Sequence, residues 1–191
     1  MQTPNHAERE HATWSASSAK RNMTCAGALG LILDIAKDWP ESTNEAADWG
    51  TCAHQIGEAC LRDGSDASRF LGQTLKGKKH SFEVDEEMDD CAQKFIGYVR
   101  RRMAEYKAAT GDDAVLWIEQ RFSFADLKPP FDAGGTGDAI IWFPKWGLLE
   151  VVDLKGGRGV VVEAKGNPQL RSYGLGAMLA HPELDVETVK V

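Results

Sequence analysis

Two apolar segments joined by a short turn, residues 138–143 and 148–155, constrain the fold of this 191-residue chain more than any other feature of its sequence. The connecting residues 144–147 begin with proline and end with glycine, which predicts a turn and hence a β-hairpin. In a four-residue loop Phe143 pairs with Leu148, and counting outward places Asp138 opposite Asp153. Two facing carboxylates in so apolar a setting repel each other and are poorly solvated, and a cation between them is the simplest remedy.

Lys155 is expected on the same strand face as Asp153, because side chains alternate along a strand with period two. Two acids and one lysine at a sheet edge form a candidate site for metal-dependent hydrolysis. The pattern G-x-x-D at residues 135–138, followed by D-x-K at residues 153–155, resembles the PD-(D/E)XK nuclease superfamily in its RecB-like exonuclease branch.

Three further segments match this branch in the same order along the chain. They are S-x-S…C at residues 15–25, G-T-x-x-H-x-x-x-E at 50–58 and Q-x-x-x-Y at 169–173. The five matches together cover residues 15 to 180, and the chain most resembles phage- and prophage-borne members of the branch.

The resemblance implies a restriction-endonuclease-like domain of the α/β (α+β) class, with a mixed central β-sheet flanked by helices. It implies a DNA exonuclease that depends on Mg²⁺ or Mn²⁺ and acts in phage DNA recombination, repair or processing. A catalytically weak or inactive DNA-binding module with the same fold is the alternative. Beyond DNA, a phage recombinase or a single-strand-binding protein is the expected partner, and self-association into a homo-oligomer is left open.

The resemblance also assigns roles to individual residues. Asp138 and Asp153 would hold the ion, and Lys155 would act on the attacking water, although it also suits a plain salt bridge to Asp153. The further expected ligands are Glu58, the imidazole of His54 and the carbonyl oxygen of Leu154. His54 and Glu58 lie one helical turn apart, where the alternative is an ordinary surface hydrogen bond.

A second set of expected site residues follows the hairpin. Gln169 and Tyr173, one helical turn apart, would orient Lys155 or hold a DNA phosphate, and the alternative is a pair of polar residues at the edge of the core. Arg158 and Arg171 are the nearest candidates for phosphate contacts, because guanidinium groups bind phosphate oxygens well.

The net charge of −7 is unusual for a DNA-binding chain, so the distribution of charge matters more than its sum. Six acids at 83–90 precede the basic run 100–102, and acids before bases predict a single long helix of ~20 residues. Phosphate contact by these arginines is the alternative. The basic loop 76–80 is either a solvated surface loop or a segment that guides a DNA strand. Glu119 is expected to have a structural role, in which it balances the charge of a lysine or arginine.

Further periodic segments predict the other elements. Helices are expected at 19–25, 51–62 (with Thr51 as N-cap) and 168–180; strands at 114–124 and 185–191; and a connector at 40–44. We expect one domain over residues 1–191, with 1–14 flexible, and four reduced cysteines. No apolar run approaches ~18 residues and the polar start lacks a secretion signal, so the expected location is the cytoplasm of a bacterial host cell, away from membranes.

Overall fold

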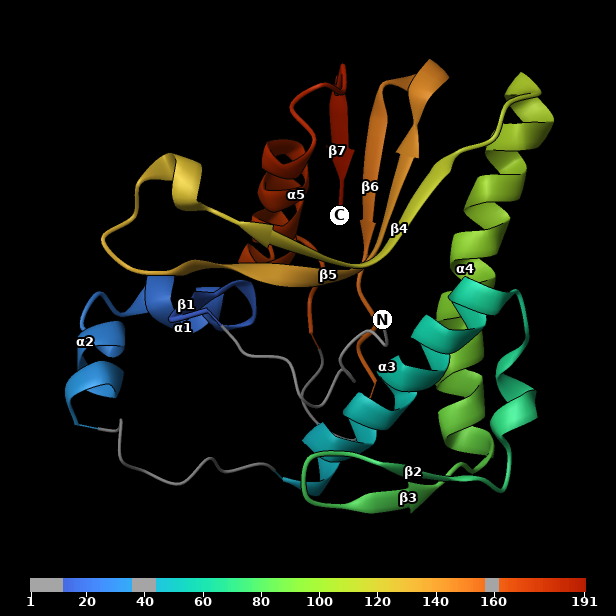
Figure 1. Cartoon of the computed structure of the whole chain (residues 1–191), viewed down its shortest axis with the longest axis horizontal. Helices are drawn as coiled ribbons and strands as arrows, with labels where there is room; N and C mark the ends of the chain where they lie inside the picture. The colour runs from blue at the N-terminus through green and yellow to red at the C-terminus, as the bar shows by residue number, and fades with distance from the viewer. Residues whose placement is uncertain (1–11, 36–43, 157–161) are drawn as a thin grey trace.

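The computed structural model describes residues 12–35, 44–156 and 162–191. Within these ranges the chain forms a curled, mixed five-stranded sheet flanked by helices (Figure 1), which confirms the expected α/β class. The connector expected at 40–44 falls largely outside the described residues. Trp14 does not belong to a flexible segment, because it pairs with Ala133 in the sheet.

The described ranges hold five α-helices. These are α1 (Ala19–Thr24), α2 (Ala28–Asp34), α3 (Glu45–Asp63), α4 (Glu86–Thr110) and α5 (Pro168–Ala180). The expected start of α3 at Thr51 is wrong, because the side chain of Asn44 caps the helix by accepting from the Ala47 amide, and Thr51 lies inside it. The helix ends at Asp63, one residue after the predicted end at 62, and Gly64 follows as its C-cap with a left-handed φ of 78°. Helix α2 is an element that the sequence patterns do not predict.

The strands form one sheet and one separate hairpin. They are β1 (Trp14–Ser15), β2 (Thr74–Lys76), β3 (Ser81–Glu83), β4 (Val115–Ser123), β5 (Ala133–Phe143), β6 (Leu148–Val152) and β7 (Thr188–Lys190). β5 is central, with antiparallel β4 on one side and antiparallel β6 on the other, while β1 runs parallel to its first residues. β7 pairs in parallel with β6 and is shorter than the predicted 185–191. Within the described part of the chain, β2 and β3 pair only with each other, and the sequence patterns do not predict them.

The predicted hairpin register is confirmed. Phe143 pairs with Leu148, and the ladder continues to the pair of Ala139 and Val152. Asp138 and Asp153 are therefore next in register, immediately beyond the last β6 pair. β5 begins at Ala133, earlier than the apolar pattern suggests, so Asp138 lies within a long strand rather than at its start.

Alternate side chains of β5 pack against different helices. Ile141 and its odd-numbered neighbours join the core with α3 and α4, whereas Ile140 and Trp142 pack with Ala177 of α5. Figure 1 shows α4 and α5 on opposite sides of the sheet strands. α5 can approach the sheet closely at Gly176, because glycine lacks the Cβ that would overlap the ring of Phe122. None of the helices in the described ranges combines the length and apolar character needed to cross a membrane.

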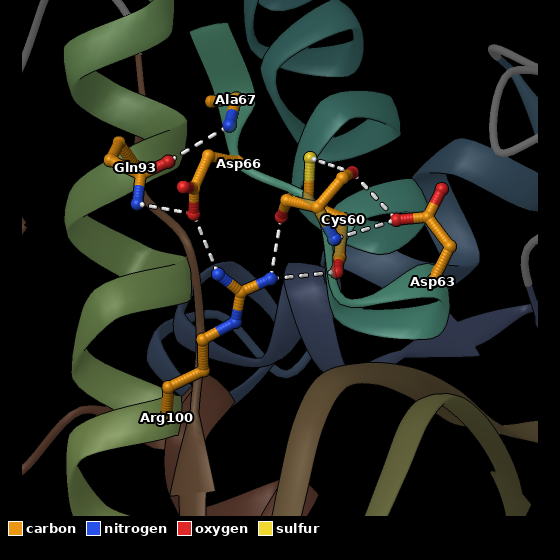
Figure 2. Close-up of polar contacts among 7 residues, drawn as sticks. Cys60, Asp63, Asp66, Ala67, Gln93 and Arg100 are labelled. Carbon is orange, nitrogen blue, oxygen red and sulfur yellow. Dashed lines mark hydrogen bonds and ion pairs between the residues drawn. The ribbon is translucent and has the colours of Figure 1, made fainter. Parts of the chain in front are cut away.

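Two arginines of the basic run on α4 have structural partners, and Figure 2 shows those of Arg100. Arg100 Nη1 lies 2.7 Å from Asp66 Oδ1, and its Nη2 donates to the carbonyl oxygens of Cys60 and Ser65. Arg102 Nε donates to the buried Glu150 carboxylate at 2.9 Å. These contacts favour the structural interpretation over phosphate binding for Arg100 and Arg102. They hold a helix of 25 residues, longer than predicted.

Candidate active site

One pocket of about 410 Å³ gathers most of the predicted site residues. α3, β5, the segment after β6, and α5 all contribute to its lining. The predicted residues among its lining are His54, Asp138, Asp153, Lys155, Gln169 and Tyr173. Residues that are far apart in sequence therefore converge on one cavity, as a composite active site requires.

Asp138 lies at the centre of the site and is buried. Its Oδ1 lies 3.4 Å from His54 Nδ1, and its Oδ2 accepts a hydrogen bond from the Leu154 amide at 2.7 Å. Burial disfavours the charged form, but His54 and the Leu154 amide together lower the pKa of Asp138 below its usual value. Leu154 therefore contacts Asp138 through its N–H, and the expected role of its carbonyl oxygen as a ligand stays a prediction.

Asp153 and Lys155 form an ion pair, with Nζ 2.5 Å from Oδ2. Apart from this ion pair, that buried oxygen has no hydrogen-bond partner among the described residues. Burial and the charge of Asp138 raise the pKa of Asp153 to about 6, against the opposing effect of Lys155. The two acids thus differ in kind: Asp138 stays charged, while Asp153 holds its charge only at a cost that a cation would relieve.

His54 projects from α3 onto the same carboxylate. Burial disfavours its protonated form, but the charge of Asp138 more than compensates and raises the pKa of His54. The imidazole is therefore held beside a carboxylate that favours a positive charge at this point. A metal ion requires the neutral imidazole and would take the place of that proton.

Glu119 is a site residue that the sequence interpretation missed. It lies on β4 between the pairs Ile118–Ala139 and Gln120–Gly137, and so faces Asp138. Its φ of 52° is left-handed, which is uncommon for a residue other than glycine and costs free energy inside a strand. One potential ligand atom from each of Glu119, His54 and Asp138 lies within 4.8 Å of the others. The expectation that Glu119 only balances a basic residue is thus too narrow.

Glu58 is not placed in this group. Its Oε1 accepts from Arg62 Nε and Nη2 at 3.2 and 3.0 Å, whereas His54 contacts Asp138. Arg171 is exposed on α5 and is not part of the pocket lining, while Arg158 lies outside the described residues.

Gln169 and Tyr173 form a pair on α5 at the wall of the pocket. Gln169 Nε2 donates to the Tyr173 hydroxyl at 2.7 Å, and the Tyr173 ring packs edge-on against Phe122. Burial, followed by the charge of Asp153, raises the pKa of Tyr173, so its hydroxyl stays neutral and can donate a hydrogen bond. Arg121 and Lys78, which the sequence motifs do not assign to the site, also line the pocket.

The donor set suits a hard or borderline divalent ion. Carboxylate oxygens are the preferred ligands of Mg²⁺, and Mn²⁺ also accepts imidazole. Asp138, Glu119 and His54 supply these donors from three elements, and Asp153 adds a buried carboxylate next in register. The residues present therefore fit the ion that the sequence motifs imply.

Replacing Asp153 with asparagine should stabilise the metal-free protein at neutral pH. A folded-state pKa of about 6 against an ordinary value of 3.8 means that folding disfavours the charged form. This penalty is absent below about pH 4, grows between the two pKa values and is complete above about pH 6. Urea unfolding in EDTA should show a gain of the order of 1–3 kcal/mol near pH 7.5 that vanishes near pH 4. A variant less stable than wild type at both pH values would contradict this expectation.

Comparison with known proteins places the chain in a family. No solved structure matches it. Residues 11–191 match a family model described as "Protein of unknown function (DUF2800)". Because this match spans nearly the whole chain, the protein belongs to the DUF2800 family.

Proposed function

We propose that this protein is a divalent-metal-dependent deoxyribonuclease that hydrolyses phosphodiester bonds. The observation that carries the proposal is the convergence of Asp138, Asp153, Lys155 and His54 in one pocket, at the positions where the sequence motifs imply them. Exonuclease action, a role in phage DNA recombination, repair or processing, and partnership with a recombinase or single-strand-binding protein rest on the motif resemblance alone.

Asp138, Glu119 and His54 would hold Mg²⁺ or Mn²⁺, with Asp153 as a further donor. The bound ion would neutralise charge on the phosphodiester and lower the pKa of a water molecule. The chain's own residues must then place that water, bind the developing charge and keep the metal ligands deprotonated. The low pKa of Asp138 serves the last requirement, because this carboxylate is charged at any physiological pH.

Lys155 is the group best placed to act on the reacting atoms. Its side chain is 41% exposed, it lines the pocket, and its ammonium is held by Asp153 Oδ2. From there it can donate a hydrogen bond to the attacking water and stabilise the negative charge that builds on the phosphate oxygens. The neutral hydroxyl of Tyr173, fixed by Gln169, offers a second donor in the same pocket.

Metal binding is tested by thermal unfolding with increasing Mn²⁺, because a ligand bound only by the folded state raises the melting temperature. At about 100 times Kd the gain is about 2.7 kcal/mol, or roughly 5–10 °C for a chain of this size. Glu119→Gln should require a higher Mn²⁺ concentration for the same shift, because it removes one ligand.

Glu58→Gln is the matched control, since Glu58 contacts Arg62 instead of the ligand group. It should respond to Mn²⁺ as the wild type does. An equal effect of both substitutions, or an effect of Glu58→Gln alone, would overturn the assignment of Glu119 as a ligand. A metal-induced shift without DNA cleavage would favour the inactive DNA-binding alternative.

A further inference from the structure

We propose that the turn between β2 and β3 is a fixed phosphate-contact surface that guides a DNA strand into the pocket. The basic turn, residues 76–80, contains three lysines and one histidine in a chain whose net charge is −7. This inference rests on the proposed function for the identity of the polyanion. The docking of the turn beside the site is observed independently of that function.

A buried carboxylate holds the basic turn in place. Asp48, in the first turn of α3, is 1% exposed. Its Oδ1 accepts from the Lys78 amide at 3.0 Å, and its Oδ2 accepts from the amides of Lys79 and His80 at 2.9 and 2.8 Å. The His80 ring Nδ1 lies 2.7 Å from the same Oδ2. Charged acceptors make strong hydrogen bonds, so three consecutive amides on one carboxylate define the backbone of the turn closely.

Two further contacts seat the basic turn on α3. A Cβ at Gly77 would lie only 2.7 Å from the Asp48 Cβ, so the approach of the turn to the helix requires glycine. Gln55 Nε2 donates to the Lys76 carbonyl oxygen at 3.0 Å. Asp48 and Gln55 flank His54 on the same helix, so the turn and the candidate metal ligand share one rigid support.

The basic turn lies next to the candidate active site. Lys78 lines the pocket together with His54, Asp138 and Lys155, and Arg121 of β4 lines it as well. The side chains of Lys76, Lys78 and Lys79 are solvent-exposed, where they can meet a ligand that approaches the pocket. Acidic metal ligands repel a phosphate backbone until an ion is bound, so basic groups at the entrance are needed to draw DNA in.

The described contacts that hold the basic turn in place are made by its backbone and by the His80 ring. The anchoring bonds use main-chain amides, Gly77 and the His80 ring, so replacing the side chains of Lys78 and Lys79 leaves them intact. Lysine ammonium groups act as point charges on phosphates and carry no base information. The surface should therefore contribute affinity that falls with salt and is independent of DNA sequence.

The test compares a Lys78→Gln/Lys79→Gln double variant with wild type. Binding of a labelled oligonucleotide is measured in EDTA over a salt series, so that no cleavage occurs. Each lost phosphate contact should reduce the slope of log K against log salt by ~0.7–0.9, giving about 1.5 for the pair, with affinity at low salt falling on the order of tenfold.

Lys107→Gln/Lys145→Gln is the matched control, because both lysines are exposed and pair with acids near the C-terminal end of α4. It should keep the wild-type slope. Gly77→Ala is a second probe: it dislodges the turn yet retains every charge, and it should weaken binding as well. Melting temperatures verify that each variant is folded.

A double variant that keeps the wild-type affinity and slope would overturn the proposed surface, whatever the cleavage activity. Wild-type protein that binds no DNA at low salt would overturn it too. If wild type binds DNA through the basic turn but cleaves none with Mn²⁺, the surface stands and the nuclease function fails. The two proposals can therefore fail separately.

Discussion

Asp138→Asn should reduce DNA cleavage by ~10³-fold or more while leaving the protein folded. The carboxylate of Asp138 contacts His54 and the Leu154 amide and is the most central of the potential ligands. Asparagine has the same shape and keeps an oxygen that can accept from Leu154, but it removes the charge that attracts a cation. Loss of metal-derived charge stabilisation is worth several kcal/mol in the transition state, which corresponds to this fall in rate.

The matched control for this substitution is Asp126→Asn, because Asp126 is exposed and does not line the pocket. It should cleave at the wild-type rate. If Asp138→Asn also cleaves at that rate, Asp138 is not a metal ligand and the proposed site is wrong. Thermal unfolding in EDTA should show both variants folded.

Lys155→Met should lower kcat by ~10²-fold or more while DNA binding in EDTA stays within a few-fold of wild type. Methionine keeps much of the apolar stem but removes the ammonium that lies against Asp153. A group that acts mainly in the transition state affects kcat rather than binding, and loss of one such donor costs about 10²–10³-fold in enzymes that stabilise an oxyanion.

A purely structural salt bridge would give a different pattern. Loss of Lys155 would then leave Asp153 unbalanced, and the damage would appear in stability or metal affinity with kcat preserved. Lys107→Met is the control, since Lys107 is exposed and pairs with Asp113 on the surface. A Lys155→Met protein that binds Mn²⁺ and DNA normally and cleaves at a near wild-type rate would contradict the catalytic role.

The hairpin was predictable because its signals are local. Pro144 and Gly147 mark the turn, and strand alternation then fixes which side chains share a face. The end of α3 was predictable to within one residue for the same reason, because a glycine follows the helix as its C-cap. The start of α3 was not, because Asn44 and Thr51 are both acceptable N-caps and only the packing of the first turns of the helix distinguishes them.

The parts of the site that the sequence did not reveal depend on contacts between distant segments. Glu119 joins the site through the pairing of β4 with β5 and an unusual backbone conformation, neither of which a local pattern encodes. The basic turn depends on Asp48, which lies 30 residues from Lys78 along the chain. Glu58 satisfied the helical spacing to His54, but spacing alone cannot show that Arg62 takes up its carboxylate.

The most direct test of the nuclease proposal is a time course with end-labelled single- and double-stranded oligonucleotides in Mg²⁺, Mn²⁺ or EDTA. Wild-type protein and Asp138→Asn, purified in parallel, are compared at equal concentration. The proposed site predicts shortening of the labelled strand by wild type with either ion and none in EDTA, and shortening by the variant that is slower by ~10³-fold or more with either ion. Intact DNA in every wild-type reaction, or equal digestion by wild type and Asp138→Asn, would contradict it.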